Sequence, residues 1–158
     1  MRSLRLALWP IARPLFHFYW RFARGATVGV RAMVIDGAGR LFLVKHSYME
    51  GWHLPGGGVE TGETVLTALA RELAEEGNIL MTALPVLHGM FFNSRVSRRD
   101  HVAMFIVRDF HQIGPPVPDY EIIAHGFYAL DSLPEDTSRA TRARIAEVFG
   151  GVAVSELW

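Results

Sequence analysis

Hydrophobic and polar residues alternate with a period of two near the start of the chain, which is the pattern of a half-buried β-strand. Residues 26–36 read ATVGVRAMVID, the turn sequence GAGR follows, and LFLVKH forms a second apolar run. Residues 26–46 therefore predict a β-hairpin. Three further strands are expected in LPVLHGMFFN (84–93), HVAMFIVRDF (101–110) and AHGFYALDSLP (124–134), the first two joined by the basic loop SRVSRRD (94–100).

Two segments repeat their apolar residues with the period of an α-helix. One covers residues 138–150, with Ser138 as its N-cap. In the other, residues 64–76, the buried stripe is expected to contain Leu66, Leu69, Ala70, Leu73 and Ala74. Strands interleaved with two helices predict a single α/β or α+β domain, in which helices cover the faces of a mixed sheet.

Length and composition limit the classes of protein that fit. With 158 residues the chain has the size of one domain with a core, and 16 basic residues balance 16 acidic ones. This balance gives no argument for a nucleic-acid partner. The chain has no cysteine, which excludes disulfides and thiolate metal sites and agrees with a reducing, cytoplasmic location.

The first 24 residues differ from the rest, because they carry five arginines, many aromatic residues and no acid. Their longest uncharged runs have seven residues, too short for a membrane-spanning helix, and Arg13 interrupts the apolar core that a secretory signal needs. We expect a helical arm (1–24) in front of a domain at 25–158. Three roles stay open for the arm: packing on the domain or on a second copy in a homodimer, peripheral contact with a membrane interface, and ordering on ligand binding.

Three glutamates crowd one side of the helix expected at 64–76. Glu72 precedes Glu75 and Glu76 by three and four residues, and like charges at this helical spacing repel each other. A divalent cation among the carboxylates would remove the repulsion. Directly before the helix, three consecutive glycines in PGGGVETGE (55–63) let backbone approach a ligand, and the helix start suits an anion. Mg²⁺ prefers carboxylate oxygen and bridges to phosphates, and no histidine pair at zinc spacing lies on this helix.

Residues 57–79, GGVETGETVLTALARELAEEGNI, resemble the Nudix box, whose pattern is G-x5-E-x7-R-E-U-x-E-E-x-G-U with U an aliphatic residue. Asn78 stands where the pattern has glycine. That glycine ends the helix in a left-handed conformation, for which asparagine is the next best residue. The matching positions are Gly57, Glu63, Arg71, Glu72, Leu73, Glu75, Glu76 and Ile79.

The resemblance implies an α/β/α sandwich and hydrolysis of a nucleoside diphosphate linked to a further group X, with Mg²⁺ or Mn²⁺ as cofactor. It implies that the metal ligands are Glu72, Glu75, Glu76 and the carbonyl of Gly56 or Gly57. Glu63 and Arg71 would support them, because Arg71 would fix a carboxylate in place. Glu72 is the first choice for the general base; Glu121, Asp100 and Asp119 are alternatives that could also complete the metal shell.

Several residues are candidates for substrate contacts, each with a structural alternative. Arg95 and Arg98 could bind phosphates from the basic loop or be solvated there. Arg31 could reach the diphosphate or form a surface ion pair. Trp52 could stack on a base or pack in the core, and His53 could face the ligand or act as an isolated polar residue.

The partner expected is therefore a small nucleoside diphosphate derivative, and the sequence does not select which one. Two other functions stay open: a catalytically weak nucleotide-binding module on the same fold, and a membrane-associated regulatory module that acts through residues 1–24. The intact set of glutamates argues against lost catalysis, because a binding module would have no need of the repulsive cluster.

Overall fold

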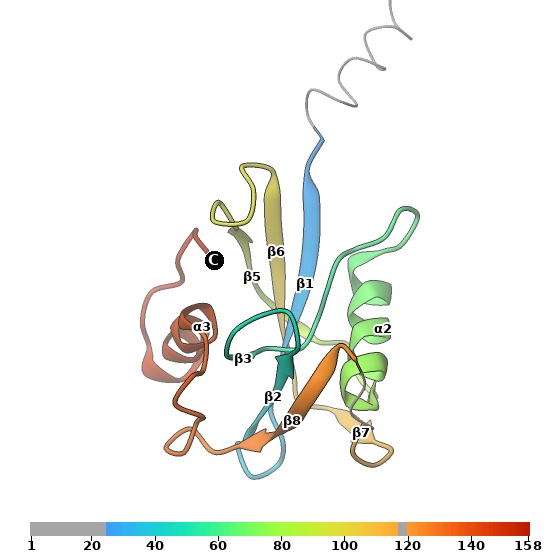
Figure 1. Ribbon diagram of the computed structural model, residues 1–158, viewed down its shortest axis with the longest axis vertical. Coiled ribbons are helices and arrows are strands. Elements are labelled where there is room, and N and C mark those ends of the chain that lie inside the picture. Colours follow the sequence, from blue (N-terminus) through green and yellow to red (C-terminus); the bar gives the residue numbers. More distant parts are fainter. Residues whose placement is uncertain (1–24, 117–119) are drawn as a thin grey trace, which may run out of the picture.

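The structure is a computed structural model that describes residues 25–116 and 120–158. The expected N-terminal arm and Asp119 lie outside these residues. Figure 1 labels the elements within them. In chain order they are β1 (Thr27–Val34), β2 (Leu41–His46), β3 (Trp52–His53), α2 (Val65–Gly77), β4 (Ile79–Met81), β5 (Val86–Phe92), β6 (Asp100–Val107), β7 (Phe110–Gln112), β8 (Ile122–Tyr128) and α3 (Arg139–Gly150).

The strands form three sheets, the largest of which has the order β1-β6-β5. In it β1 runs parallel to β6 and β5 runs antiparallel to β6, so this sheet is mixed as expected. The other two sheets, β3-β2-β8 and β4-β7, are antiparallel. The α/β class and the hairpin formed by β5 and β6 are confirmed, whereas a single sheet is replaced by three.

The expected hairpin at residues 26–46 is wrong, although both of its strands exist. Between β1 and β2 only one bridge forms, from Ile35 to Leu41. Beyond it β1 pairs along its whole length with β6, and β2 pairs with β3 and β8. The physical reason is burial. The second half of β1 has hydrophobic core on both of its faces, and this arrangement requires β1 and β2 to lie in different sheets.

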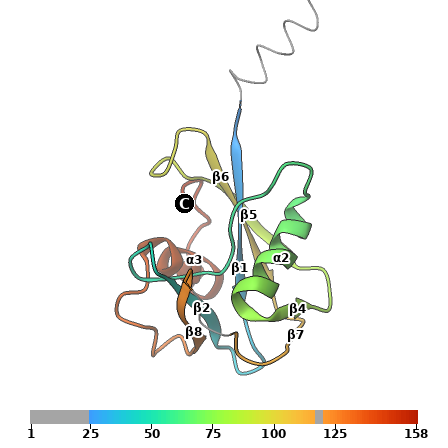
Figure 2. The ribbon, with the colours of Figure 1, turned by 45° about the vertical axis from the view of Figure 1, so that its right-hand side comes forward.

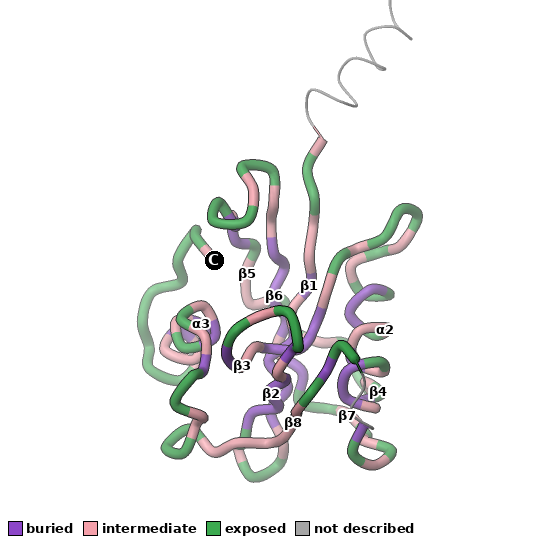
Figure 3. Tube along the Cα trace, viewed as in Figure 1, coloured by how far each residue is buried: buried purple, intermediate pink, exposed green. Residues whose placement is uncertain are grey.

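The two faces of β1 belong to two different hydrophobic cores. Val30, Ala32 and Val34 pack in the core that contains Leu69 and Leu73 of α2. Met33 and Ile35 pack in the other core, against which partly buried residues of α3 lie. Figures 1 and 2 show the two helices on opposite sides of the strands, and Figure 3 shows the buried residues gathered between them.

Helix α2 is capped at both ends, and the cap at its C-terminal end is the one that the sequence predicts. The Thr64 hydroxyl accepts a hydrogen bond from the Thr67 N–H at its start. At its end Asn78 adopts a left-handed conformation with φ of 50° and donates its N–H to the carbonyls of Ala74 and Leu73. Asparagine therefore takes the conformational role of the glycine in the Nudix pattern.

The buried stripe of α2 differs from the prediction, because the helix is rotated about its axis. Leu66 and Ala70, expected in the stripe, are exposed. The buried residues are instead Ala68, Leu69, Leu73, Glu76 and Gly77. The rotation turns Glu76 inward, which places one carboxylate of the acidic cluster under the glycine loop.

Helix α3 begins after Ser138, whose hydroxyl accepts from the Thr141 N–H, so the predicted N-cap is confirmed. The chain then returns toward the sheet, and a bridge pairs Leu157 with Phe92 at the end of β5. Among the described residues, no helix combines the length and the apolar character needed to cross a membrane.

Candidate functional site

The glycine loop in front of α2 lies beside β1 as an extended segment. Gly57 accepts a hydrogen bond from the Val30 N–H at 2.8 Å, and Val59 donates its N–H to the Val28 carbonyl at 2.9 Å. At Gly56 the backbone has φ of 135°, and a Cβ would lie 2.1 Å from the Val30 carbonyl oxygen. The loop can therefore lie this close to β1 only with glycine at that position.

The next position in the loop is crowded by the acidic helix. A Cβ on Gly57 would lie 2.3 Å from Oε1 of Glu72. The Glu72 carboxylate therefore sits directly over loop backbone, where a larger residue would displace it. The glycines thus serve the site by letting the carboxylates of α2 and the backbone of the loop meet.

Glu76 carries a buried carboxylate, because the residue is only 6% exposed. Few neighbouring groups offset the cost of burying its charge. Its Oε2 accepts a hydrogen bond from the Gly56 N–H at 2.7 Å, and its Oε1 lies 3.6 Å from Nε2 of His46. Burial lowers the pKa of His46 to about 4, so this neighbour is neutral near pH 7. Burial raises the pKa of Glu76 to about 7, although Arg31 and the Gly56 N–H act in the opposite direction.

Arg71 connects the other glutamates of the motif. Its Nη1 donates to Glu72 at 2.8 Å and to Glu75 at 3.3 Å, and its Nε donates to Glu63 at 3.1 Å. Its Nη2 donates to the Gly58 carbonyl at 3.0 Å. One guanidinium thus ties the helix to the loop and fixes the Glu72 side chain.

The carboxylates that Arg71 contacts differ in their protonation behaviour. Burial raises the pKa of Glu72, although the hydrogen bond from Arg71 acts against it. The hydrogen bond from Arg71 lowers the pKa of Glu63. Glu63 is therefore a fixed negative charge that holds Arg71, whereas Glu72 lies in a setting where a further positive charge would be favourable.

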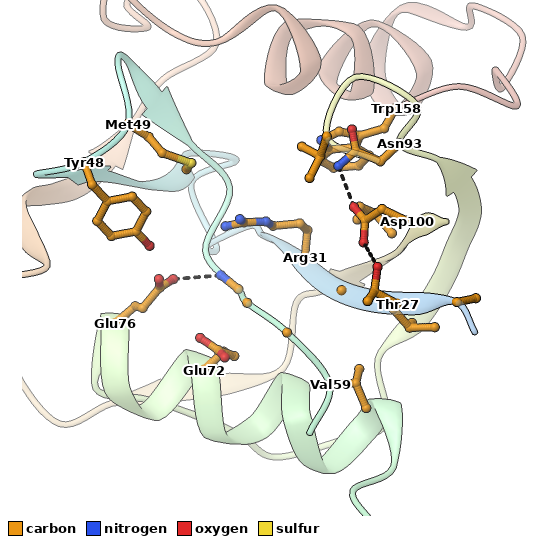
Figure 4. A pocket seen from close by; sticks show the side chains of 18 of the residues that line it. Thr27, Arg31, Tyr48, Met49, Val59, Glu72, Glu76, Asn93, Asp100 and Trp158 are labelled. Atoms are coloured by element: carbon orange, nitrogen blue, oxygen red, sulfur yellow. Dashed lines mark hydrogen bonds between the residues drawn. The ribbon is translucent and has the colours of Figure 1, made fainter. Parts of the chain in front are cut away.

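A cleft of about 780 Å³ lies over the glycine loop and the first half of β1. Glu72, Glu76 and Glu121 line it, and the Tyr48 hydroxyl donates to Glu121 at 2.9 Å. Burial, together with Glu121, raises the pKa of Tyr48 to about 12, so this hydroxyl keeps its proton. In Figure 4, Arg31 lies between the carboxylates and a second group of side chains. That group contains Thr27, Asn93, Asp100 and Trp158.

The expected set of three metal-binding glutamates is not assembled in this structure. Within residues 25–116 and 120–158, no three histidine, aspartate or glutamate side chains gather closely enough to hold a metal ion. The Glu75 side chain is 60% exposed and contacts Arg71 instead of lining the cleft. Glu72 and Glu76 do share the cleft, and the residue that joins them there is Glu121.

The donors that line this end of the cleft nevertheless fit a hard cation. Carboxylate oxygens of Glu72, Glu76 and Glu121 are the ligands that Mg²⁺ and Mn²⁺ prefer. Of the two backbone candidates, the carbonyl of Gly57 already accepts the Val30 N–H, which favours the carbonyl of Gly56.

Of the expected substrate contacts, the structure brings only Arg31 to the cleft, where its Nη1 donates to the Leu54 carbonyl at 2.9 Å. Trp52 packs edge-on against Tyr128 with ring centroids 5.0 Å apart, and His53 bonds the Glu50 carbonyl at 2.8 Å. These contacts favour the structural role that the sequence left open for both residues.

The two arginines of the basic loop also lie away from this cleft. Arg95 lines a separate hollow next to α3. Arg98 is exposed and is not among the residues lining either hollow. The loop meets the cleft through other residues, Asn93 at its start and Asp100 at its end.

Four residues at the site were missed by the sequence interpretation: His46, Tyr48, Asn93 and Trp158. Asn93 left a weak signal, since it ends a predicted strand directly before the basic loop. Trp158 left none, because its place depends on the return of the chain to β5 after α3.

Comparison with known proteins assigns the family. The family model described as NUDIX domain matches residues 25–149, which is well over half of the chain. The chain belongs to the Nudix family. Nudix hydrolases act on nucleoside diphosphate derivatives and typically depend on a divalent metal ion. The box in residues 57–79 is therefore confirmed as a family motif, including the variant with Asn78.

A curated relative and two solved structures are similar to this Nudix chain. The RNA pyrophosphohydrolase of Dinoroseobacter shibae is 40% identical over 60 residues, which cover 37% of this chain and only 38% of that protein. The MutT NUDIX hydrolase of Burkholderia pseudomallei is 27% identical, with a TM-score of 0.66 over 78% of this chain and 98% of that one. A NUDIX hydrolase from Nitrosomonas europaea, 18% identical, shares the fold with a TM-score of 0.66 over 84% and 99% of the two chains.

Proposed function

We propose that this Nudix chain is a Mg²⁺- or Mn²⁺-dependent pyrophosphohydrolase that cleaves the diphosphate of a nucleoside diphosphate linked to a further group X. The observation that carries the proposal is the state of Glu76. This carboxylate is buried, keeps a single hydrogen bond from the Gly56 N–H among the described residues, and shares its cleft with Glu72 and Glu121. Such a group is stabilised in its charged form once a divalent cation occupies the cleft.

The residues of the cleft have different roles in the proposed reaction. Glu72, Glu76, Glu121 and the Gly56 carbonyl would hold the metal. When bound, a divalent ion supplies positive charge against the diphosphate and lowers the pKa of a water molecule. Glu75 is exposed and does not line the cleft, so we assign it a part in metal binding only if its side chain leaves Arg71.

The supporting residues hold these ligands in place. Glu63 fixes Arg71, and Arg71 fixes Glu72 over the glycine loop. Arg31 lies in the cleft next to the carboxylates and offers its guanidinium to a diphosphate oxygen.

In the reaction a water oxygen attacks phosphorus, the bridging P–O bond breaks, and a nucleoside monophosphate and a phosphorylated X are released. Glu72 takes the proton of the attacking water in this proposal, because it lines the cleft and Arg71 holds its carboxylate in place. Glu121 and Asp100 also line the cleft and are the alternatives. Asp119, the fourth candidate, lies outside the described residues.

Names of similar proteins support the class of bond rather than one substrate. The curated relative is an RNA pyrophosphohydrolase, and a solved structure of 21% identity is an ADP-ribose pyrophosphatase from Streptococcus suis. Both names describe hydrolysis of a pyrophosphate, with different groups on either side. We propose a small nucleoside diphosphate derivative as substrate and the cytoplasm as location, with residues 25–158 forming the hydrolase domain.

A product screen tests the proposal. The full chain is incubated with nucleotide sugars, dinucleotides, NADH, ADP-ribose and oxidised nucleotides, with Mg²⁺ or with EDTA, and phosphate products are measured. We expect turnover of at least one diphosphate, loss of this turnover in EDTA, and loss in Glu76→Gln. Glu135→Gln, which removes an exposed carboxylate far from the motif, is the control. Nucleotide binding without turnover in Mg²⁺ and Mn²⁺ would identify a binding module instead.

A further inference from the structure

The cleft has a second end, and its chemistry differs from that of the acidic end. Asn93, Asp100, Thr27 and Trp158 line it, on the far side of Arg31 from Glu72 and Glu76 (Figure 4). This end combines one large aromatic ring with an amide, and both oxygens of the Asp100 carboxylate already accept hydrogen bonds there. A diphosphate bound at the acidic end would thus have a polar, aromatic compartment within the same cleft.

Trp158 is held firmly in this position. Its N–H donates to the Phe92 carbonyl at 3.1 Å, and Phe92 donates its own N–H to the Glu156 carbonyl at 2.8 Å. The indole packs edge-on against Phe91 with ring centroids 5.5 Å apart. The Arg144 guanidinium lies over the indole at 5.5 Å from the ring centroid, and Trp158 is partly exposed and lines the cleft.

A buried ionic network fixes the segment that carries Trp158. The Arg144 side chain is 2% exposed and donates to the Leu157 carbonyl at 3.0 Å and to Glu147 at 2.7 Å. Glu147 also accepts the Ser155 N–H at 3.0 Å and contacts His88 at 2.8 Å. The chain after α3 is therefore anchored at several points, which gives the indole one defined orientation.

Asn93 presents a hydrogen-bond acceptor beside this ring. It is 8% exposed, and its Nδ2 donates to Asp100 at 2.8 Å. Because a carboxylate only accepts, this bond fixes which way the amide points. The Oδ1 of Asn93 then has no donor among the described residues, while Asp100 accepts a second bond from the Thr27 hydroxyl at 2.7 Å.

We propose that Trp158 and Asn93 form the subsite for the nucleobase of the substrate. The base stacks on the part of the indole that lines the cleft, and one of its N–H groups donates to Oδ1 of Asn93. Purines bind more tightly than pyrimidines, because their larger rings overlap more of the indole. The assignment rests on the proposed function, since it needs the diphosphate at the acidic end.

Calorimetry with two non-hydrolysable probes separates the base from the diphosphate. In Mg²⁺, the full chain is titrated with α,β-methylene-ADP and with methylenediphosphonate, which has no base, and then with α,β-methylene-CDP. For the wild type we expect the adenine probe to bind at least roughly tenfold more tightly than methylenediphosphonate, with the cytosine probe between them. Trp158→Leu keeps an apolar contact with Phe91 and removes the stacking surface, so it should lose roughly this tenfold ratio.

Two further variants distinguish stacking from packing. Trp158→Phe should keep most of the ratio, whereas a purely structural role would make Phe and Leu equivalent. Phe149→Ala, on α3 and outside the residues lining the cleft, should leave the ratio unchanged. Methylenediphosphonate binding with equal ratios in the wild type and Trp158→Leu would overturn the nucleobase subsite alone. Absence of binding by every probe would contradict the proposed function, and the subsite with it.

Discussion

Two buried glutamates on the two helices of this molecule are surrounded very differently. Glu147 of α3 meets the buried Arg144 at 2.7 Å, accepts a backbone N–H from Ser155 and contacts His88. Glu76 of α2 accepts one backbone N–H, from Gly56, and among the described residues its one close side-chain partner is a histidine that burial keeps neutral.

From this difference we propose that the Glu147 carboxylate serves stability and the Glu76 carboxylate serves function. A buried charge with a cation and several hydrogen bonds is complete, and removing it leaves its partners unpaired. A buried carboxylate without a matching cation costs free energy of folding, and such a cost is typical of a site that awaits a ligand. Glu147 belongs to the first class and Glu76 to the second.

The largest expected effect is on catalysis, in Glu76→Gln. The amide keeps an oxygen for the Gly56 N–H but has no charge for a metal ion, so kcat/KM should fall on the order of 10²–10³-fold. Steady-state kinetics at saturating Mg²⁺ measures it. A decrease of less than about threefold would remove Glu76 from the site.

The matched substitution in the other helix, Glu147→Gln, should act on stability instead. It leaves the Arg144 guanidinium buried without a counter-charge, and we expect a loss of about 3 kcal/mol in the free energy of unfolding. Urea unfolding at pH 7.5 measures this loss. By contrast, Glu76→Gln in EDTA should be as stable as the wild type or more stable. Equal destabilisation by both substitutions would contradict the difference in role between Glu76 and Glu147.

The pH dependence of metal-free stability sharpens the same comparison. The pKa of Glu76 is about 7 in the folded chain and near 4.5 when unfolded, so the native state binds more protons between these values. Stability should therefore be greatest below pH 4.5 with respect to this group and fall by about 3 kcal/mol as the pH rises to 7. Urea unfolding in EDTA across pH 5–8 tests this, and Glu76→Gln should lack this component of the slope.

A smaller effect is expected at Arg71, whose guanidinium joins Glu63, Glu72 and Glu75. Arg71→Lys keeps the charge but cannot bond all three carboxylates, so Glu72 loses its fixed position and metal affinity should fall about tenfold. Activity measured against Mg²⁺ concentration should show a higher half-saturating concentration with less change in the maximal rate. An unchanged Mg²⁺ dependence would show that Glu72 needs no such support.

The sequence predicted the elements well and their partners less well. The period-two and helical patterns located the five longer strands and both helices, since these patterns report local exposure, but they missed the short strands β3, β4 and β7. They did not reveal that β1 pairs with β6 instead of β2, because a strand with core on both faces gives no signal for its partner. The patterns also did not predict the rotation of α2 about its axis, because this rotation depends on how the helix packs against the sheet.

The functional site was also predicted only in part from the sequence. The motif named Glu72 and Glu76 together with the glycine loop, and the structure brings these together. The motif implied Glu75 as a metal ligand in the same way, but in the structure its side chain contacts Arg71. Trp158 and Asn93 are far from the motif in sequence, and only the return of the chain to β5 brings the tryptophan to the cleft.

The most direct test of the central claim is Mn²⁺ binding followed by electron paramagnetic resonance, with α,β-methylene-ADP present. The claim is that the carboxylates of Glu72 and Glu76 hold a divalent ion against a diphosphate. We predict that the wild type removes Mn²⁺ from the free pool and that Glu76→Gln binds it at least about tenfold more weakly. Equal binding by both proteins, or no binding by the wild type, would contradict the claim.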